Sequence, residues 1–185
     1  MDRALASEAR NGGSSPFRRT IKMKITLNNK VIDTETLPYR QGVIGIVIDN
    51  SANFLIVQMV NYGESDWRFP GGGVNDGEKS KAALLRELEE ELGSKSFKII
   101  KKSSLVNQYD WPDSVIISRS KKEQKTWRGQ QQSQFLAKFT GSNNELSPDP
   151  SEIKRIKWAK YNELKSHFTF PNQWKLAEKT LNDLL

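Results

Sequence analysis

Short runs of apolar and β-branched residues, separated by turn residues, mark the middle of the chain. Residues 43–48 read Val-Ile-Gly-Ile-Val-Ile and residues 54–60 read Phe-Leu-Ile-Val-Gln-Met-Val, with Asp49-Asn50-Ser51 between them. Runs of this kind, bounded by turn residues, predict strands, and the short turn predicts that these two pair in the centre of a sheet. Weaker patterns predict an edge strand, a short extended piece and four further strands, at 21–27, 67–70, 97–106, 115–118, 132–139 and 153–158.

Two segments carry a helical pattern instead. Between Lys79 and Leu92 the leucines recur at helical spacing and predict one buried face, formed by Leu84, Leu85, Leu88 and Leu92. Residues 171–185 begin with proline, which is favoured in the first turn of a helix, and continue as an amphipathic pattern. Many strands with few helices predict an α+β fold with a mixed β-sheet.

Composition limits the size and setting of this fold. The chain has 185 residues, 36% of them hydrophobic and 28% charged, with a net charge of +7. These values are typical of a globular protein with one core, so we expect a single domain over residues 21–185. The first twenty residues have linker composition, with Asn-Gly-Gly-Ser-Ser-Pro at 11–16, and predict a disordered tail over 1–20. No apolar run approaches the ~20 residues of a membrane-spanning helix, so we expect a cytoplasmic protein without membrane contact.

The residue inventory also limits the chemistry. The sequence has no cysteine and one histidine, His167. Thiolate zinc sites, iron–sulfur clusters, cysteine nucleophiles and histidine-cluster metal sites are therefore excluded. A bound metal would need oxygen ligands, which suits Mg²⁺ or Mn²⁺.

Three carboxylates gather in the last turns of the helix predicted from Lys79. Glu87, Glu90 and Glu91 stand at i, i+3 and i+4, where like charges repel, and negative charge near a helix C-terminus opposes the helix dipole. A divalent cation would turn both costs into attraction, although a solvated acidic face partnered by Lys79, Lys81 and Arg86 is an alternative. The preceding Gly-Gly-Gly at 71–73 lets backbone approach a ligand closely, and this favours a site for a metal–phosphate complex.

These residues resemble the Nudix box. Gly72 is followed after five residues by Glu78, and after seven more by Arg-Glu-Leu-Glu-Glu-Glu-Leu-Gly at 86–93. Every fixed position of the pattern is filled, and Ser94 stands where the family prefers an aliphatic residue. The resemblance implies an α/β/α sandwich with a mixed sheet.

The same resemblance implies the hydrolysis of a pyrophosphate bond in a nucleoside diphosphate linked to another group. Mg²⁺ or Mn²⁺ would be held by Glu87, Glu90 and Glu91, with the carbonyl of Gly72 as a further ligand. Arg86 would orient these carboxylates. The metal would neutralise phosphate charge and activate water, with Glu90 and Arg86 in the catalytic set.

Further segments are similar to the dinucleoside-tetraphosphate hydrolases and the bacterial RNA 5′ pyrophosphohydrolases. The similarity rests on Tyr-Arg at 39–40, Trp-Arg-Phe-Pro at 67–70, Tyr-Asp-Trp-Pro at 109–112 and Gly-Gln-Gln-Gln at 129–132. It implies that Glu152 helps to hold metal or activate water, and that Arg40 and Phe170 grip a base. Gly-Gly-Gly at 71–73, where this group has Gln-Gly-Gly, and Ser133-Gln134, where it has Lys-Trp, depart from its pattern.

Basic and aromatic residues add candidates for substrate binding. The segment 101–128 carries seven positive and three negative residues, which suits a polyphosphate or an RNA 5′ end, although a solvated basic face is equally compatible. Aromatic rings in this region either stack on bases or pack in the core, and we expect core roles for Trp67 and Trp158. The candidates for substrate contact are Arg40, Tyr109, Arg128, Gln130 and Phe170.

The sequence thus predicts a metal-dependent pyrophosphohydrolase acting on a dinucleoside tetraphosphate or on the 5′-triphosphate end of RNA. Two alternatives stay open. The protein could hydrolyse free nucleoside triphosphates or nucleotide sugars, or it could be a silent module that only binds nucleotide or RNA.

Overall fold

The centre of the molecule is a five-stranded mixed sheet. The computed structural model describes residues 24–185 except 28 and 124, and it orders the strands β5-β6-β3-β4-β7. Their bounds are β3 Tyr39–Ile48, β4 Phe54–Met59, β5 Phe97–Asp110, β6 Gly129–Phe139 and β7 Ile153–Ala159. β3 runs parallel to β6, and every other neighbouring pair is antiparallel. The expected pairing of residues 43–48 with 54–60 in the centre of the sheet is confirmed.

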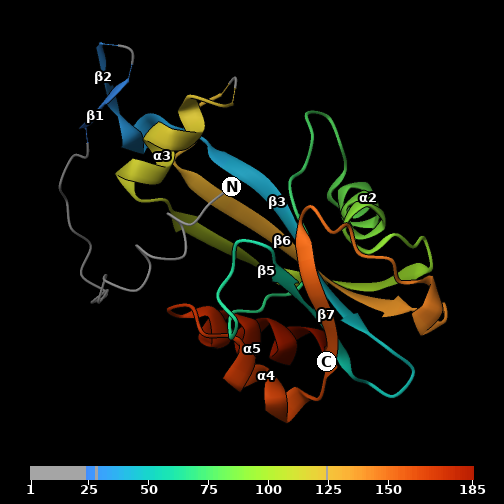
Figure 1. Ribbon diagram of the computed structural model, residues 1–185. Helices are drawn as coiled ribbons and strands as arrows, with labels where there is room; N and C mark the ends of the chain where they lie inside the picture. The colour runs from blue at the N-terminus through green and yellow to red at the C-terminus, as the bar shows by residue number, and fades with distance from the viewer. Residues whose placement is uncertain (1–23, 28, 124) are drawn as a thin grey trace.

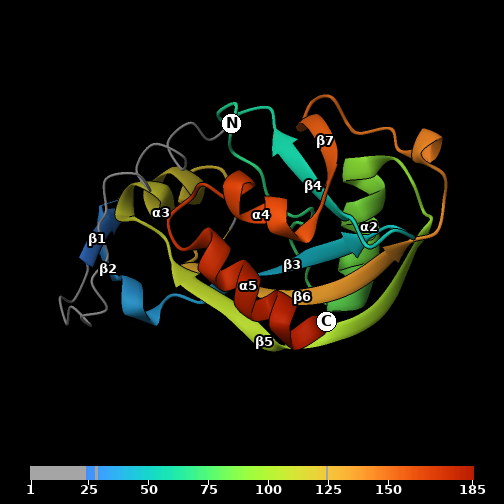
Figure 2. The same ribbon diagram turned by 90° about the horizontal axis from the view of Figure 1, so that it is seen from below.

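Helices cover both faces of this sheet, as Figures 1 and 2 show: α2 Ser80–Leu92 lies on one face, and α4 Tyr161–His167 and α5 Gln173–Leu184 lie on the other. Successive strand residues point to opposite faces. Accordingly Val43, Val47, Leu55 and Val57 pack against α2, and a second cluster under α4 and α5 contains Ile46, Phe54, Ile56, Leu164 and Leu181. The predicted α+β fold with a mixed sheet in an α/β/α sandwich is confirmed.

Helix α2 forms where the sequence predicts it. Leu84, Leu88 and Leu92 are fully buried against the sheet. Leu85, placed on the same face by the periodicity, is 36% exposed at the margin. The helix ends at Gly93, which takes the left-handed conformation (φ 69°) and donates its N–H to the Glu89 carbonyl.

A second, two-stranded sheet lies beside the main sheet. Strands β1 Lys24–Leu27 and β2 Lys30–Asp33 form their own two-stranded sheet, followed by the short 3-10 helix η1 Thr34–Thr36. The hairpin packs against helix α3 Asp113–Ser120, as Figures 1 and 2 show. The edge strand expected at 21–27 is confirmed for Lys24–Leu27, and it pairs with β2 in this separate two-stranded sheet. Residues 21–23 lie outside the described part of the chain.

Other expectations are confirmed with shifted ends. β5 continues to Asp110, β6 begins at Gly129, and the C-terminal helix spans Gln173–Leu184. The strand predicted at 115–118 is wrong, since these residues lie inside helix α3. Val115 and Ile116 are buried there at adjacent positions on its inner side.

The remaining sequence-based expectations concern two tryptophans, the ends of the domain and membrane-spanning helices. Trp67 is buried as expected, and Trp158 is partly buried against the cluster under α2. The tail predicted for 1–20 lies outside the described residues, and the single domain over 21–185 stays a prediction. Within the described part of the chain, no helix has the length and apolar character needed to span a bilayer.

Candidate active site

A cleft of about 1130 Å³ opens between the loops at the ends of the sheet, and the carboxylate face of α2 lines it. Residues of β3, β5 and β6 form its floor, and the glycine loop 71–73, the loop 59–62, helix α3 with the two residues before it, and the segment 168–177 contribute to its walls. Among the predicted site residues, the lining set is Arg40, Gly72, Glu87, Glu90, Glu91, Tyr109, Gln130, Glu152 and Phe170. The fold therefore brings together residues that are up to 130 positions apart in the sequence.

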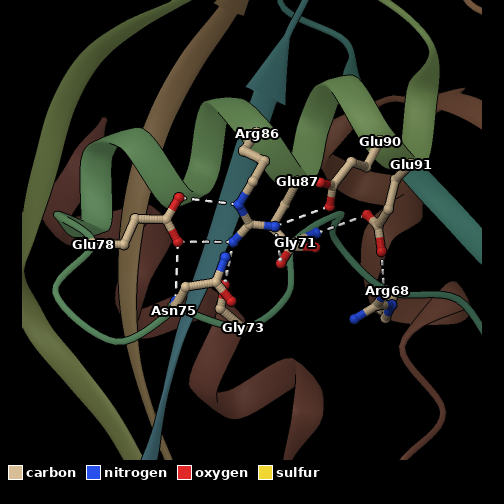
Figure 3. A network of polar contacts seen from close by, with 9 residues as sticks. All are labelled: Arg68, Gly71, Gly73, Asn75, Glu78, Arg86, Glu87, Glu90 and Glu91. Carbon is tan, nitrogen blue, oxygen red and sulfur yellow. Dashed lines mark hydrogen bonds and ion pairs between the residues drawn. The ribbon is translucent and has the colours of Figure 1, made fainter.

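Arg86 organises the first group of acidic side chains, as Figure 3 shows. Its Nη1 donates to Oε1 of Glu87 and Oε2 of Glu90, at 2.9 Å each. Its Nε and Nη2 both bind the carboxylate of Glu78, at 3.0 and 2.9 Å, and Nη2 also donates to the Gly73 carbonyl at 2.8 Å. One guanidinium thus ties the start of α2, its acidic face and the glycine loop together. Hydrogen bonding to Glu78, and further contacts with Glu87 and Glu90, raise the pKa of Arg86.

Glu91 belongs to a second, buried group. Its side chain is 3% exposed, and Oε1 accepts a hydrogen bond from Nη2 of Arg68. Its other oxygen, Oε2, accepts from the backbone N–H of Gly71 at 2.9 Å. Burial raises the pKa of the Glu91 carboxyl, whereas Arg68 and the Gly71 N–H act in the opposite direction. Figure 3 shows Arg68 on the opposite side of the carboxylate group from Glu78.

These two arginines change the interpretation of the acidic face. The sequence indicates mutual repulsion among Glu87, Glu90 and Glu91, and names Lys79, Lys81 and Arg86 as possible partners. In the structure Arg86 is shared by Glu87 and Glu90, while Arg68, distant in sequence, takes Glu91. Much of the expected repulsion is therefore compensated within the fold. The role predicted for Arg86 as an orienting partner agrees with its contacts.

The glycine loop is held so tightly that side chains are excluded from it. A Cβ atom at Gly72 would lie 2.1 Å from Oε2 of Glu87, so the backbone of Gly72 packs directly on that carboxylate. At Gly71 (φ 142°) a Cβ atom would lie 2.2 Å from the Val43 carbonyl oxygen. The Gly72 carbonyl oxygen accepts from the Val43 N–H at 2.9 Å, which joins the loop to β3. One lone pair of that carbonyl is thereby used and the second is left for another contact.

The donor set fits a hard divalent cation. Glu87, Glu90, Glu91 and the Gly72 carbonyl supply only oxygen ligands, the kind that Mg²⁺ and Mn²⁺ prefer. Close packing of Gly72 against Glu87 brings two of these predicted ligands together. In the described part of the chain no three acidic or histidine side chains already surround one point. Their charges are instead taken by Arg86 and Arg68, so a cation at this face would replace part of that pairing.

The predicted substrate residues lie around the same cleft with one exception. The guanidinium of Arg40 lies against Gly73, where a Cβ atom would be 2.4 Å from its Nη2. Tyr109 donates its hydroxyl to Oε1 of Gln130 at 2.9 Å across the sheet. The backbone N–H of Phe170 is held by Gln173. Glu152, in the turn before β7, has an exposed side chain at the cleft.

Arg128 is placed differently. It is absent from the described lining of the cleft, and its Nε and Nη2 bind the carboxylate of Asp110 at 2.9 and 2.8 Å. Asp110 also accepts a hydrogen bond from the Tyr39 hydroxyl at 2.6 Å. The guanidinium lies 5.5 Å from the centre of the Tyr39 ring. Arg128 therefore connects the start of β3, the end of β5 and the start of β6, and its guanidinium is paired with the Asp110 carboxylate.

Sequence reasoning missed Arg68 and Tyr62. Arg68 pairs with Glu91, and Tyr62 packs edge-on against Phe170 with ring centres 5.0 Å apart. Arg119, one of the seven basic residues of the segment 101–128, lies over the Trp111 ring at 4.6 Å. The signal for Arg68 was available as a lone arginine between Trp67 and Phe69, in a segment predicted to be extended. Tyr62 carries no such signal, because it lies in a loop whose path depends on distant contacts.

Comparison with known proteins adds an independent line of information. The model of the NUDIX domain family matches residues 38–180. An RNA pyrophosphohydrolase of Rickettsia canadensis (strain McKiel) is 38% identical over 133 residues, covering 70% of this chain and 80% of the relative. An RNA pyrophosphohydrolase of Rickettsia prowazekii (strain Madrid E) is 37% identical over 142 residues, covering 75% and 84%.

Solved structures share the fold at low sequence identity. A C. elegans Ap4A hydrolase binary complex matches with a TM-score of 0.56 and 17% identity, covering 77% of this chain and 96% of that one. The E. coli dihydroneopterin triphosphate pyrophosphohydrolase matches with a TM-score of 0.59 and 14% identity, covering 78% and 99%. At these identities the likeness concerns the arrangement of sheet and helices.

Proposed function

Because this chain belongs to the Nudix family, whose domain model spans residues 38–180, we propose that it is a divalent-metal-dependent pyrophosphohydrolase acting at the 5′-triphosphate end of RNA. The observation that carries the proposal is the carboxylate face of α2, which lines a cleft of about 1130 Å³. A dinucleoside polyphosphate presents the same kind of pyrophosphate bond, with a second nucleoside where the RNA 5′ end has a terminal phosphate, and is the closest alternative substrate.

Glu87, Glu90, Glu91 and the Gly72 carbonyl would hold the metal, for which Mg²⁺ or Mn²⁺ suits the all-oxygen ligands. When bound, such a metal neutralises phosphate charge and lowers the pKa of a coordinated water. The chain's own residues set this up. Arg86 holds Glu87 and Glu90 side by side at 2.9 Å each, and Arg68 with the Gly71 N–H fixes both oxygens of Glu91.

Glu152 would accept the proton of the attacking water. Its carboxylate comes from the turn before β7, and its exposed side chain faces the cleft from a different element than the α2 glutamates. Its backbone is fixed at both ends, since its N–H donates to Asp149 and its carbonyl accepts from Val60 at 2.9 Å. A base supplied from outside the metal-binding helix stays available for proton transfer while the other carboxylates are engaged.

The substrate assignment rests on the size and lining of the cleft together with the relatives. A volume of about 1130 Å³ exceeds the range of roughly 300–1,000 Å³ in which proteins bind drug-sized ligands. Arg40 offers a cation beside the glycine loop, and Phe170 with Tyr62 offers aromatic surface for a base. RNA pyrophosphohydrolases 37–38% identical to this chain support RNA over a free nucleotide.

A substrate panel tests this proposal. Purified protein with Mg²⁺ or Mn²⁺ is compared on 5′-triphosphorylated RNA, diadenosine tetraphosphate, ATP, dGTP, ADP-ribose and a nucleotide sugar by kcat/KM. We expect RNA to be at least tenfold better than any free nucleotide. A tenfold preference for a free nucleotide, ADP-ribose or a nucleotide sugar would overturn the substrate. Tight binding of RNA with no hydrolysis would overturn the enzyme itself.

A further inference from the structure

The N-terminal hairpin and helix α3 share a small hydrophobic core of their own. Ile25 of β1 is buried together with Trp111, Val115 and Ile116, and Leu27, Ile32 and Leu37 pack around them. This cluster is separate from the two that join the main sheet to its helices. Among the residues that the structure describes, those of the hairpin form no strand pairing with the main sheet. Residues 24–37 lie ahead of the region matched by the family model.

Part of this small core is also the wall of the cleft. Trp111 and Val115 belong to the cluster and also line the cleft, together with Pro112 and Arg119. These four residues are called the α3 wall below. The Trp111 ring supports the guanidinium of Arg119 at 4.6 Å, and Nη1 of Arg119 binds Glu123 at 2.7 Å. The position of this cationic wall therefore depends on how firmly Trp111 and Val115 are seated on the hairpin.

Neither partner would be stable alone. Helix α3 has eight residues, and isolated helices shorter than about 12 residues are marginal in water. No side chain caps its N-terminus. A two-stranded hairpin of four residues per strand is likewise marginal without a packed face. The hairpin and helix α3 therefore stabilise each other by packing, so a destabilised hairpin should also make the cleft wall formed by α3 less ordered.

The wall lies away from the carboxylates. In Figures 1 and 2, α3 stands beside the N-terminal ends of β3 and β6, while α2 lies across the sheet at some distance from it. A substrate with its pyrophosphate at the glutamates would meet the α3 wall only through its distant part. For an RNA 5′ end, that part is the second nucleotide and those that follow.

We propose that the hairpin 24–37 is a buttress that positions the α3 wall, and that this wall, through Arg119 and the surface beside Trp111, binds the part of the substrate beyond its first nucleotide. The proposal rests on the function proposed above. Arg119 is a specificity-determining contact for a phosphodiester or base, and Ile25 is a positioning residue that acts through Trp111 and Val115.

The test compares two substrates that differ only in the distant part, ATP and a 5′-triphosphorylated tetranucleotide beginning with A. The variants are Ile25→Ala in the small core and Arg119→Gln on the wall. Val31→Ala is the matched control, because Val31 is a β-branched residue of the same hairpin that is 66% exposed. We expect Ile25→Ala to raise the KM for the tetranucleotide about fivefold or more, with kcat and the constants for ATP within about twofold of wild type. Arg119→Gln should raise the KM for the tetranucleotide at least about fivefold more than the KM for ATP. Val31→Ala should match wild type on both substrates.

Amide hydrogen exchange gives a second readout. Ile25→Ala should speed exchange in residues 113–120 without changing α2, whereas Arg119→Gln should leave exchange unaltered. Equal losses on both substrates for Ile25→Ala, with no change of substrate ratio for Arg119→Gln, would overturn the inference, because the hairpin would then serve general stability. A wild-type preference for free nucleotides would instead overturn the proposed function and the inference with it.

Discussion

Arg68 and Glu91 form an ion pair that links the extended segment before the glycine loop to the last turn of α2, with Glu91 only 3% exposed. Arg68 is held in turn by a two-way backbone bridge with Val57, at 2.8 and 3.0 Å. The pair thus fixes one proposed metal ligand relative to the centre of the sheet. Removing one partner would leave the other buried without its counter-charge.

Arg68→Met should therefore lower the free energy of unfolding by about 3 kcal/mol, since an uncompensated buried charge costs several kcal/mol. The measurement is urea-induced unfolding at neutral pH. Glu64→Gln is the control, because Glu64 forms exposed ion pairs with Lys154 and Arg155 and its loss should matter much less. An equal effect for both variants would contradict a special role for the buried pair.

Glu87→Gln and Glu90→Gln should each lower kcat by about 100-fold or more in saturating Mg²⁺, which corresponds to about 2.7 kcal/mol of transition-state stabilisation. Glu89→Gln offers a matched control on the same helix turn, because the Glu89 side chain pairs with the exposed Lys95 and is itself 47% exposed. Its kcat should stay within about twofold of wild type. Comparable losses at all three positions would point to general charge effects.

Metal binding should also increase the free energy of unfolding. Mg²⁺ with a non-hydrolysable nucleotide should raise the unfolding midpoint, because the folded carboxylate group binds the ion and the unfolded chain does not. A 100-fold excess over the dissociation constant would add about 2.7 kcal/mol. The shift should vanish with excess EDTA and shrink in Glu87→Gln. An unfolding midpoint that does not change with Mg²⁺ would contradict the proposed metal site.

Arg40 and Arg128 should behave differently although both are basic and were both predicted to contact substrate. Arg40→Gln should raise KM for triphosphorylated RNA about tenfold, as expected for one lost charge-assisted hydrogen bond. Arg128→Gln should mainly reduce stability, by up to about 1 kcal/mol, because its guanidinium binds Asp110. Steady-state kinetics and urea unfolding on both variants separate these effects. A larger KM increase for Arg128→Gln would restore its predicted substrate role.

The polar contacts between the C-terminal helix and β5 should weaken in acid. Asp183 accepts hydrogen bonds from the Ser103 hydroxyl and from both the N–H and the hydroxyl of Ser104, at 2.7–2.9 Å. These bonds and the nearby Lys101 lower the pKa of Asp183. Its folded pKa thus lies below the value of about 3.9 in the unfolded chain. The stabilisation is present above the unfolded pKa and is lost as pH falls through the folded pKa.

Asp183→Asn should accordingly be less stable than wild type at neutral pH, and the difference should shrink below about pH 4. Urea unfolding across this pH range gives the comparison. Glu178→Gln, on the same helix, serves as the control for a general change of charge. A stability difference that stays constant with pH would show that hydrogen bonds to the charged carboxylate do not hold this helix.

The spacing of apolar residues along the sequence predicted those helices and strands that depend mainly on neighbouring residues. Residues 79–92 carry periodic leucines and a terminal glycine, and helix α2 formed over Ser80–Leu92. The run 115–118 begins with Val115, Ile116 and Ile117, which are apolar and β-branched and favour a strand by propensity. It became helical because Val115 and Ile116 are buried in a core completed by Ile25, about 90 positions earlier. A run of four residues contains no trace of that partner.

The site shows the same division. The Nudix box names Arg86 and the three glutamates because their spacing is fixed within one helix. Arg68 and Tyr62 reach the site through the path of a loop that buried Gln58 pins by binding the Gly63 and Glu64 carbonyls, at 2.7 and 2.9 Å. Their contribution follows from three-dimensional packing, so spacing rules do not find it.

The parallel pairing of β3 with β6 sets an order of events during synthesis on the ribosome. Gln41 and Gln131, bonded side by side at 3.0 Å, are 90 positions apart, and α2 with all its glutamates is made between them. The floor of the cleft therefore closes only after β6 has left the exit tunnel, and contacts of such long range fold slowly. A nascent chain halted before residue 129 would carry the whole carboxylate helix and still lack a substrate site, so hydrolysis should begin only after β6 has been made and paired with β3.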